Sequence, residues 1–256
     1  MKLLSRLPVV RAAAAAVVLL SFPQAHAQEA GATIFQRYHA VEPAVDKATK
    51  EVEAHRFDEA KKLLEPVLKQ VPGHAGAHFL LATMAYESRD FAGALSHIET
   101  SERSLKDLDQ RYNKLLMDMK TADEAEARDI QTSMDSVISG GFDGATDVLS
   151  VDQARLDYLK AKNGEFSKRV VSFAVPSVYS FLHGNCLYRL GRASEAAAQY
   201  QLAVRSDPAN AKAWNNLINL YREAQDFDQA RKTLAQAEAA GAVIQPKLKQ
   251  SVLEGR

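Results

Sequence analysis

The sequence contains a single cysteine, Cys186, among 256 residues. An intramolecular disulfide is therefore impossible, even in an oxidising compartment, and the fold must be stabilised by packing. Lys and Arg together number 32, as do Asp and Glu, so neither sign of charge is in excess. A chain without net positive charge has no electrostatic basis for binding nucleic acid, and we expect none as a partner.

Local motifs of common enzyme sites are also missing. The sequence has no Gly-x-Ser-x-Gly, Walker loop, His-Glu-x-x-His or Gly-x-Gly-x-x-Gly segment. His74 and His78 stand four residues apart, but no nearby cysteine or carboxylate completes a metal site, so we expect a solvated pair. His183 precedes Cys186 by three residues, and the small side chains around them favour a buried structural thiol. We therefore predict no catalytic residue, no metal and no cofactor.

The N-terminus has the order of features that is typical of a secretory signal peptide. Three basic residues come first, then a short apolar run, then a small-x-small site: Lys2, Arg6, Arg11, Ala12–Leu20 and Ala25-His-Ala27. The run is too short to span a membrane. We expect residues 1–27 to be removed by cleavage after Ala27, which leaves 32 − 3 = 29 basic residues against 32 acidic ones. The mature protein is then periplasmic or secreted, without membrane insertion.

The pattern Phe-x-x-Ala recurs along the chain at a fixed distance. It starts at Phe57, Phe91 and Phe227; from 57 to 91 is 34 residues, and from 91 to 227 is 136, four times 34. Pro72 and Pro208 are also 136 residues apart. A period of this length resembles that of repeat proteins whose units are two antiparallel helices. The alternative is a helical bundle in which alanines and aromatic residues recur by accident.

Each residue type in the pattern has a physical role in such a unit. Small residues let the two helix axes approach closely, and larger apolar residues fill the remaining space. Pro208 cannot continue the helix before it, which lets the next helix fold back. Gly191 suits a left-handed helix end, and Ser194 or Asp226 can cap the following helix. The predicted small residues are Gly184, Ala196, Ala203 and Ala230, and the predicted filling residues are Tyr200, Leu217, Tyr221 and Leu234.

The period and these residues resemble the tetratricopeptide repeat, or TPR. Residues 177–244 provide two clear units, in which Trp214, Leu217, Tyr221 and Ala230 match the family pattern, and residues 41–108 provide two degenerate ones. The resemblance implies an all-α, TPR-type superhelix of antiparallel helix pairs with a central long-helix or hairpin region. Residues 28–40 carry no clear pattern, so we expect loose order there. We expect residues 245–256 to cap the open apolar end.

The central segment, 109–176, is twice 34 residues long but carries no repeat residues in phase. An apolar stripe predicts a helix, and Thr121–Glu124 fits a capping box that predicts a break before a further helix with Ile130, Met134 and Val137 on one side. Residues 139–144 then predict a loop, and a returning helix is expected from about Asp147 to Lys162, ending at Asn163-Gly164. The stripe consists of Leu105, Leu108, Tyr112, Leu115 and Met119. Either the segment consists of eroded repeats, or it is a helical hairpin inserted between two pairs of units and packed on itself or on another chain.

The resemblance also implies where a partner binds. In TPR proteins the first helix of each unit lines a concave groove that holds a protein or peptide. The corresponding positions are Phe79, Thr83, Tyr86, Phe181, Asn185, Tyr188, Arg189, Lys212, Asn215, Asn219 and Arg222. A carboxylate clamp is disfavoured, because Asn185, Asn216 and Lys212 match it but Phe181 replaces a clamp lysine.

These features predict an exported scaffold or adaptor that binds a protein or peptide partner, without catalysis, in bacterial cell-envelope assembly, secretion or coordination. The alternative is a self-associating structural or accessory subunit that forms a homo-oligomer through the helices of residues 101–170. A hydrolase hidden in the central segment would require a cleft with a perturbed acid or base.

Overall fold

The computed structural model describes residues 30–139, 146–166 and 175–255. Within these ranges the regular structure is entirely helical, which confirms the all-α prediction. The helices are α2 (Ala30–Glu53), α3 (Phe57–Gln70), α4 (Ala75–Glu87), α5 (Phe91–Ser139), α6 (Thr146–Phe166), α7 (Ser177–Arg189), α8 (Ala193–Ser206), α9 (Ala211–Glu223), α10 (Phe227–Ala239) and α11 (Pro246–Glu254). The predicted signal peptide, residues 1–27, lies outside the described residues.

Consecutive helices pack as antiparallel pairs, and small residues stand where the two helices of a pair meet. The pairs are α2 with α3, α4 with the start of α5, α7 with α8, and α9 with α10. The alanines of the repeated pattern, Ala60, Ala94, Ala196 and Ala230, are all fully buried. The prediction that alanine permits close helix approach is therefore confirmed. We refer to the first helix of each pair as helix A and to the second as helix B.

The turn between helix A and helix B has the same backbone geometry in every pair. A left-handed residue stands at His55, Arg89, Gly191 and Gln225, with φ between 56° and 77°. Gly191 was predicted for this role, whereas the other three are side-chain-bearing residues. Asp226 caps α10 by accepting a hydrogen bond from the Gln229 amide (3.1 Å), but α8 begins at Ala193, so the predicted cap at Ser194 is wrong.

The stack of pairs continues across the central segment. The rings of Phe79 on α4 and Tyr179 on α7 stack with their centroids 4.2 Å apart. Both residues belong to one apolar cluster that also includes Ile98 of α5 and Leu217 of α9. The Glu102 carboxylate of α5 lies 3.1 Å from Nδ1 of His183 on α7. The third pair thus packs directly on the second, although the hairpin separates them in sequence.

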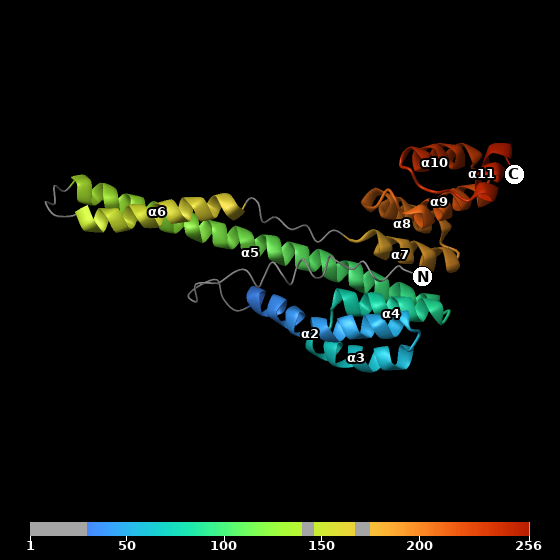
Figure 1. The fold of residues 1–256 in the computed structure, drawn as a ribbon, viewed down its shortest axis with the longest axis horizontal. Coiled ribbons are helices and arrows are strands. Elements are labelled where there is room, and N and C mark those ends of the chain that lie inside the picture. The colour runs from blue at the N-terminus through green and yellow to red at the C-terminus, as the bar shows by residue number, and fades with distance from the viewer. Residues whose placement is uncertain (1–29, 140–145, 167–174, 256) are drawn as a thin grey trace.

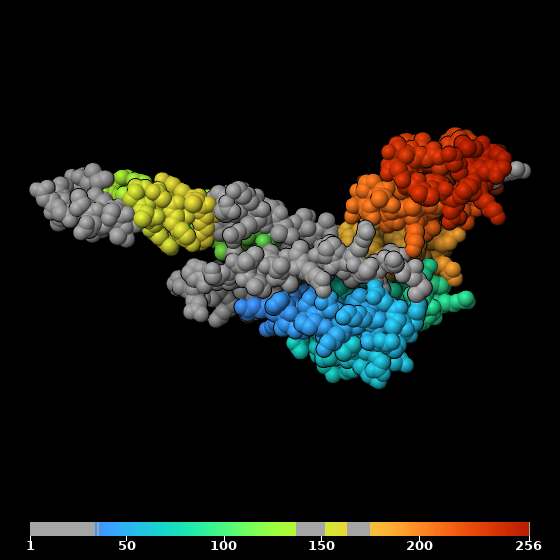
Figure 2. Space-filling view, in the orientation of Figure 1, coloured from blue at the N-terminus to red at the C-terminus, as the bar shows by residue number. Residues whose placement is uncertain are grey.

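The central segment forms a helical hairpin that projects from this stack (Figure 1). The helix α5 leaves the second pair without interruption, and α6 returns along it. Ion pairs join the two helices, from Lys162 to Asp123 (2.8 Å) and from Arg155 to Glu126 (2.8 Å). In the space-filling view of Figure 2 the hairpin is a narrow arm beside the broader stack.

The predicted helix break at Thr121–Glu124 is wrong, because α5 runs continuously from Phe91 to Ser139. Between Gly93 and Gly140 the sequence contains no glycine or proline, so nothing in it ends a helix. The Asp123 side chain pairs with Lys162 instead of capping a new helix. The returning helix also continues past Asn163-Gly164 to Phe166.

Both ends of the stack are covered by helix. The expectation of loose order in residues 28–40 is wrong from Ala30 onward, where α2 begins. Tyr38 of α2 explains part of this order, because its hydroxyl donates to the Gly73 carbonyl oxygen (2.9 Å) and its ring stacks on His74. At the other end, α11 buries Leu248 and Val252 against the last pair, in the capping position that was predicted.

Candidate partner-binding surface

The predicted groove residues lie on three A helices, α4, α7 and α9, and they divide into buried and accessible positions. Phe79 is buried in the stack against Tyr179, so it holds two pairs together and has no surface for a partner. Asn215 is also buried. Its amide donates to the Val243 carbonyl oxygen (3.0 Å), and its side-chain oxygen accepts from the Gln245 amide (2.9 Å). The structure thus corrects both assignments: Asn215 anchors the segment before α11.

Three further positions mainly support the packing. Phe181 is half-buried and contacts the apolar clusters on both sides of α7. The Asn185 side-chain oxygen accepts from the Tyr200 hydroxyl (2.8 Å) and from the Asn216 amide (2.9 Å), which joins α7, α8 and α9. Burial of the Tyr200 ring raises the pKa of its phenol far above the ordinary range, so it stays a neutral donor. Thr83 donates to the Phe79 carbonyl oxygen within its own helix (2.9 Å).

The accessible positions cluster at the C-terminal ends of α7 and α9. Tyr188 is 40% exposed, and its hydroxyl donates to the Glu223 carboxylate (2.9 Å). The Asn219 amide donates to the same carboxylate (2.7 Å), and Arg222 donates to the Asn219 side-chain oxygen (2.8 Å). The carboxylate raises the pKa of Tyr188, because it stabilises the protonated phenol. These four residues form a chain of hydrogen bonds across two repeat units.

A second accessible group lies where the second and third pairs meet. The guanidinium of Arg189 stands over the ring of Phe91, 4.6 Å from its centroid. The Tyr86 ring meets the same Phe91 ring edge-on at 5.4 Å. A cation over an aromatic face is held in place while its outer edge stays open to a ligand. Lys212 is exposed but lies in the first turn of α9, about two turns from Asn219.

We use the name A-helix surface for the accessible members of this set. It consists of Tyr86, Tyr188, Arg189, Lys212, Asn219, Arg222 and Glu223. Glu223 was missed from the sequence, although its place four residues after Asn219 on the same helix could have indicated it. The surface offers aromatic area, two guanidinium groups, one ammonium group and one carboxylate, which suit hydrogen bonding and ion pairing with another polypeptide.

The histidines at the start of α4 have structural roles. His74 is fully buried, so the expectation of a solvated pair is wrong. Its Nδ1 accepts from the Ala77 amide (3.2 Å) and so caps α4. His78 faces His97, with 3.1 Å between their Nδ1 atoms. Across the described parts of the chain, no group of three or more His, Cys, Asp or Glu side chains is placed to hold a metal ion. Cys186 is buried, as predicted for a structural thiol.

The helix pairs define a solenoid of repeated helical hairpins, and comparison with known families identifies the repeat. Tetratricopeptide-repeat models match residues 45–104 and residues 187–247. The chain is a tetratricopeptide-repeat protein. The matched ranges lie on either side of the projecting hairpin. Proteins of this kind are protein–protein interaction scaffolds and are generally not enzymes.

Similar solved structures include YrrB, described as a TPR protein with an unusual peptide-binding site (16% identity; 83% of this chain and 92% of that chain covered; TM-score 0.27). MamA AMB-1 gives 16% identity, 82% and 97% coverage and a TM-score of 0.27. The TPR2AB domain of yeast Sti1 in complex with pHSP90 gives 15% identity, 84% and 95% coverage and a TM-score of 0.26. With TM-scores this low, the assignment rests on the repeat models and the helix pattern. No curated protein in the comparison matches the chain.

None of the helices described here has the length and apolar character needed to cross a membrane.

Proposed function

We propose that this protein is a non-catalytic scaffold that binds a protein or peptide partner on its A-helix surface. The observation that carries the proposal is the chain of hydrogen bonds from Tyr188 through Glu223 and Asn219 to Arg222. It fixes an exposed aromatic side chain and a cation across two repeat units, so little conformational entropy is lost when a partner engages them.

The test uses the double variant Asn219→Ala with Arg222→Glu. Both side chains are only partly buried, so we expect helicity and melting temperature to stay unchanged while partner capture falls. The assay is photo-crosslinking in the native host from an analogue placed at Tyr188. A matched probe at exposed Lys61 on α3, outside the A-helix surface and outside the groove between α8 and α10, reports non-specific capture. A partner that crosslinks equally from both positions, or is caught undiminished by the double variant, contradicts the proposed surface.

We propose further that the protein is exported and acts in the bacterial cell envelope, in assembly, secretion or coordination. The support is the order of basic residues, apolar run and Ala25-His-Ala27 in the sequence. The mass of the protein recovered from the periplasm should correspond to a chain beginning at Gln28. Replacing Ala25 and Ala27 by glutamate should prevent cleavage. Recovery of the full-length chain from the cytoplasm would contradict export.

A second candidate function is self-association through the hairpin. The observation in its favour is that Met117 of α5 and Tyr158 of α6 are 62% and 55% exposed on a projecting arm. Sedimentation of the mature chain distinguishes the two functions. An oligomer that dissociates in the Met117→Glu, Tyr158→Glu variant supports the second candidate, and a monomer excludes it.

A further inference from the structure

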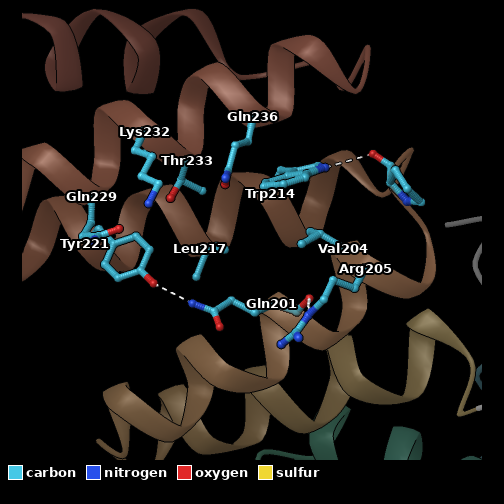
Figure 3. Close-up of a pocket in the computed structure, with 11 residues that line it drawn as sticks. Gln201, Val204, Arg205, Trp214, Leu217, Tyr221, Gln229, Lys232, Thr233 and Gln236 are labelled. Carbon is cyan, nitrogen blue, oxygen red and sulfur yellow. Dashed lines mark hydrogen bonds between the residues drawn. The ribbon is translucent and has the colours of Figure 1, made fainter.

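A groove runs between two neighbouring B helices, α8 and α10, with α9 beneath it, and it lies apart from the A-helix surface (Figure 3). It encloses about 500 Å³ and is partly open to solvent. We call it the B-helix groove. The residues used in the argument are Gln201, Arg205, Trp214, Tyr221, Lys232 and Gln236. Its volume is in the range of ligand sites, but an open trough of this kind suits an extended segment better than an enclosed small molecule.

The base of the groove is apolar and fixed in position. The Trp214 indole N–H donates to the Pro208 carbonyl oxygen (2.9 Å), which holds the ring in place (Figure 3). Trp214 is 7% exposed, and because its N–H is already bonded, the edge of the ring that lines the groove offers a ligand apolar surface. Val204 and Leu217 line the groove beside it. At one end, the Gln201 amide donates to the Tyr221 hydroxyl (2.8 Å) and joins α8 to α9. A ligand therefore meets a preformed apolar anchor point.

The rim carries positive charge without a compensating carboxylate. Arg205 projects from α8 and Lys232 from α10, and both are exposed. The described lining residues include no Asp or Glu. The neighbouring Arg231 pairs with Asp228 (2.7 Å), whereas neither Arg205 nor Lys232 forms an ion pair within the described residues. Three amide side chains, Gln201, Gln229 and Gln236, supply donors and acceptors along the same groove.

We propose that the B-helix groove binds an extended peptide segment of a partner protein in which acidic side chains flank an apolar one. The apolar side chain packs on Trp214. The carboxylates pair with Arg205 and Lys232, and the glutamine amides hydrogen-bond the peptide backbone, as their paired donors and acceptors allow. Charge complementarity selects this occupant, because a rim with two cations and no carboxylate repels basic segments.

The chain provides its own reporter for this binding, because Trp214 is its only tryptophan. The probe is a synthetic peptide, acetyl-Gly-Asp-Leu-Asp-Leu-Asp-Gly-amide, titrated into the full protein while Trp214 emission is followed. We expect a saturable change that weakens as salt is raised, since the charges are exposed and screened. The corresponding peptide with lysine in place of aspartate should give no saturable change.

Charge reversal in the groove tests the assignment of the rim. Arg205→Glu with Lys232→Glu should weaken binding of the acidic peptide by about tenfold or more, because two charge-assisted contacts become repulsive. The matched control is Lys61→Glu with Lys247→Glu, two exposed lysines outside the groove, which makes the same change in net charge. The control should bind like the unaltered protein, and circular dichroism should be the same for all three.

The proposal is overturned if the acidic peptide gives no saturable change, if the lysine peptide binds equally well, or if both charge-reversed proteins lose affinity alike. It is equally overturned if a single-stranded oligonucleotide saturates the groove and the acidic peptide does not. The Asn219→Ala, Arg222→Glu variant should retain peptide binding, because its residues lie outside the groove. The proposal for the B-helix groove and the proposal for the A-helix surface can therefore be refuted independently.

Discussion

The ring of Tyr200 occupies the space beside Gly184, so that a Cβ atom at position 184 would stand 2.7 Å from the tyrosine Cε1 atom. This contact sets the distance between α7 and α8. It also positions the Tyr200 hydroxyl for its hydrogen bonds with Asn185 and Asn216. The glycine is thus required by close approach, not by an unusual backbone angle.

Gly184→Ala should lower the free energy of unfolding by about 1–3 kcal/mol, because the added methyl displaces a buried ring and its hydrogen bonds. Gly93→Ala is the matched control, since a Cβ there meets only the exposed carboxylate of Asp90, which can rotate. Its loss of the Asp90 cap and its gain in helix propensity should offset each other within about 1 kcal/mol. Urea denaturation measures both. Equal effects at the two positions would refute the close contact.

Gln225→Gly should stabilise the protein by about 0.5–1 kcal/mol, because Gln225 has a φ of 58° that side-chain-bearing residues rarely adopt. The reciprocal change, Gly191→Ala, should cost about 1 kcal/mol at the equivalent turn. Nothing lies within 4 Å of a Cβ at Gly191, so the loss there reports backbone conformation alone. If thermal melting moves in the same direction for both variants, the two turns are not equivalent.

The stability of the protein should decrease as the pH falls through about 6.5. The pKa of His97 is lowered in the folded protein, mainly because burial disfavours the charged imidazolium and also because of the neighbouring His78. Between the folded and unfolded pKa values the unfolded chain binds more protons, so the free energy of unfolding rises with pH in this window. His97→Gln should flatten that slope between pH 7 and pH 5. Replacing the exposed His39 by glutamine should preserve it.

Cys186 should be inert toward thiol reagents in the folded protein. The thiol is buried, and burial raises its pKa to about 12, so the reactive thiolate is scarce at pH 8. One equivalent of thiol should react with Ellman's reagent after unfolding in guanidinium chloride, and almost none before. The Cys186→Ser protein gives the blank in both states. Rapid labelling of the native chain would show that the region between α7 and its neighbours opens.

The 34-residue period was enough to predict the helix pairs, because each pair is held together by residues close in sequence, such as Gly184 with Tyr200. The direct contact of Phe79 with Tyr179 could not be predicted in the same way. It joins residues that precede and follow the hairpin in sequence, and no local sequence pattern predicts which residues pack together across an insertion.

The errors at individual sites also have physical reasons. Thr121–Glu124 satisfies the residue pattern of a capping box, but an N-cap forms only where a helix begins. The residues on both sides favour a continuous helix, so no helix begins there. Asn215 matches a ligand-facing position of the repeat, yet in this chain the segment before α11 occupies its hydrogen-bonding groups. The B-helix groove was not anticipated, because its lining comes from three helices and is visible only once they are packed.

The continuity of α5 connects the hairpin rigidly to the repeat stack. A helix of 49 residues is about 74 Å long, and it passes from the second unit into the arm without a joint. The arm cannot swivel unless successive backbone hydrogen bonds break. Because α5 also packs beside the Phe79–Tyr179 contact, a change in the direction of the arm would be transmitted to the junction between the second and third pairs.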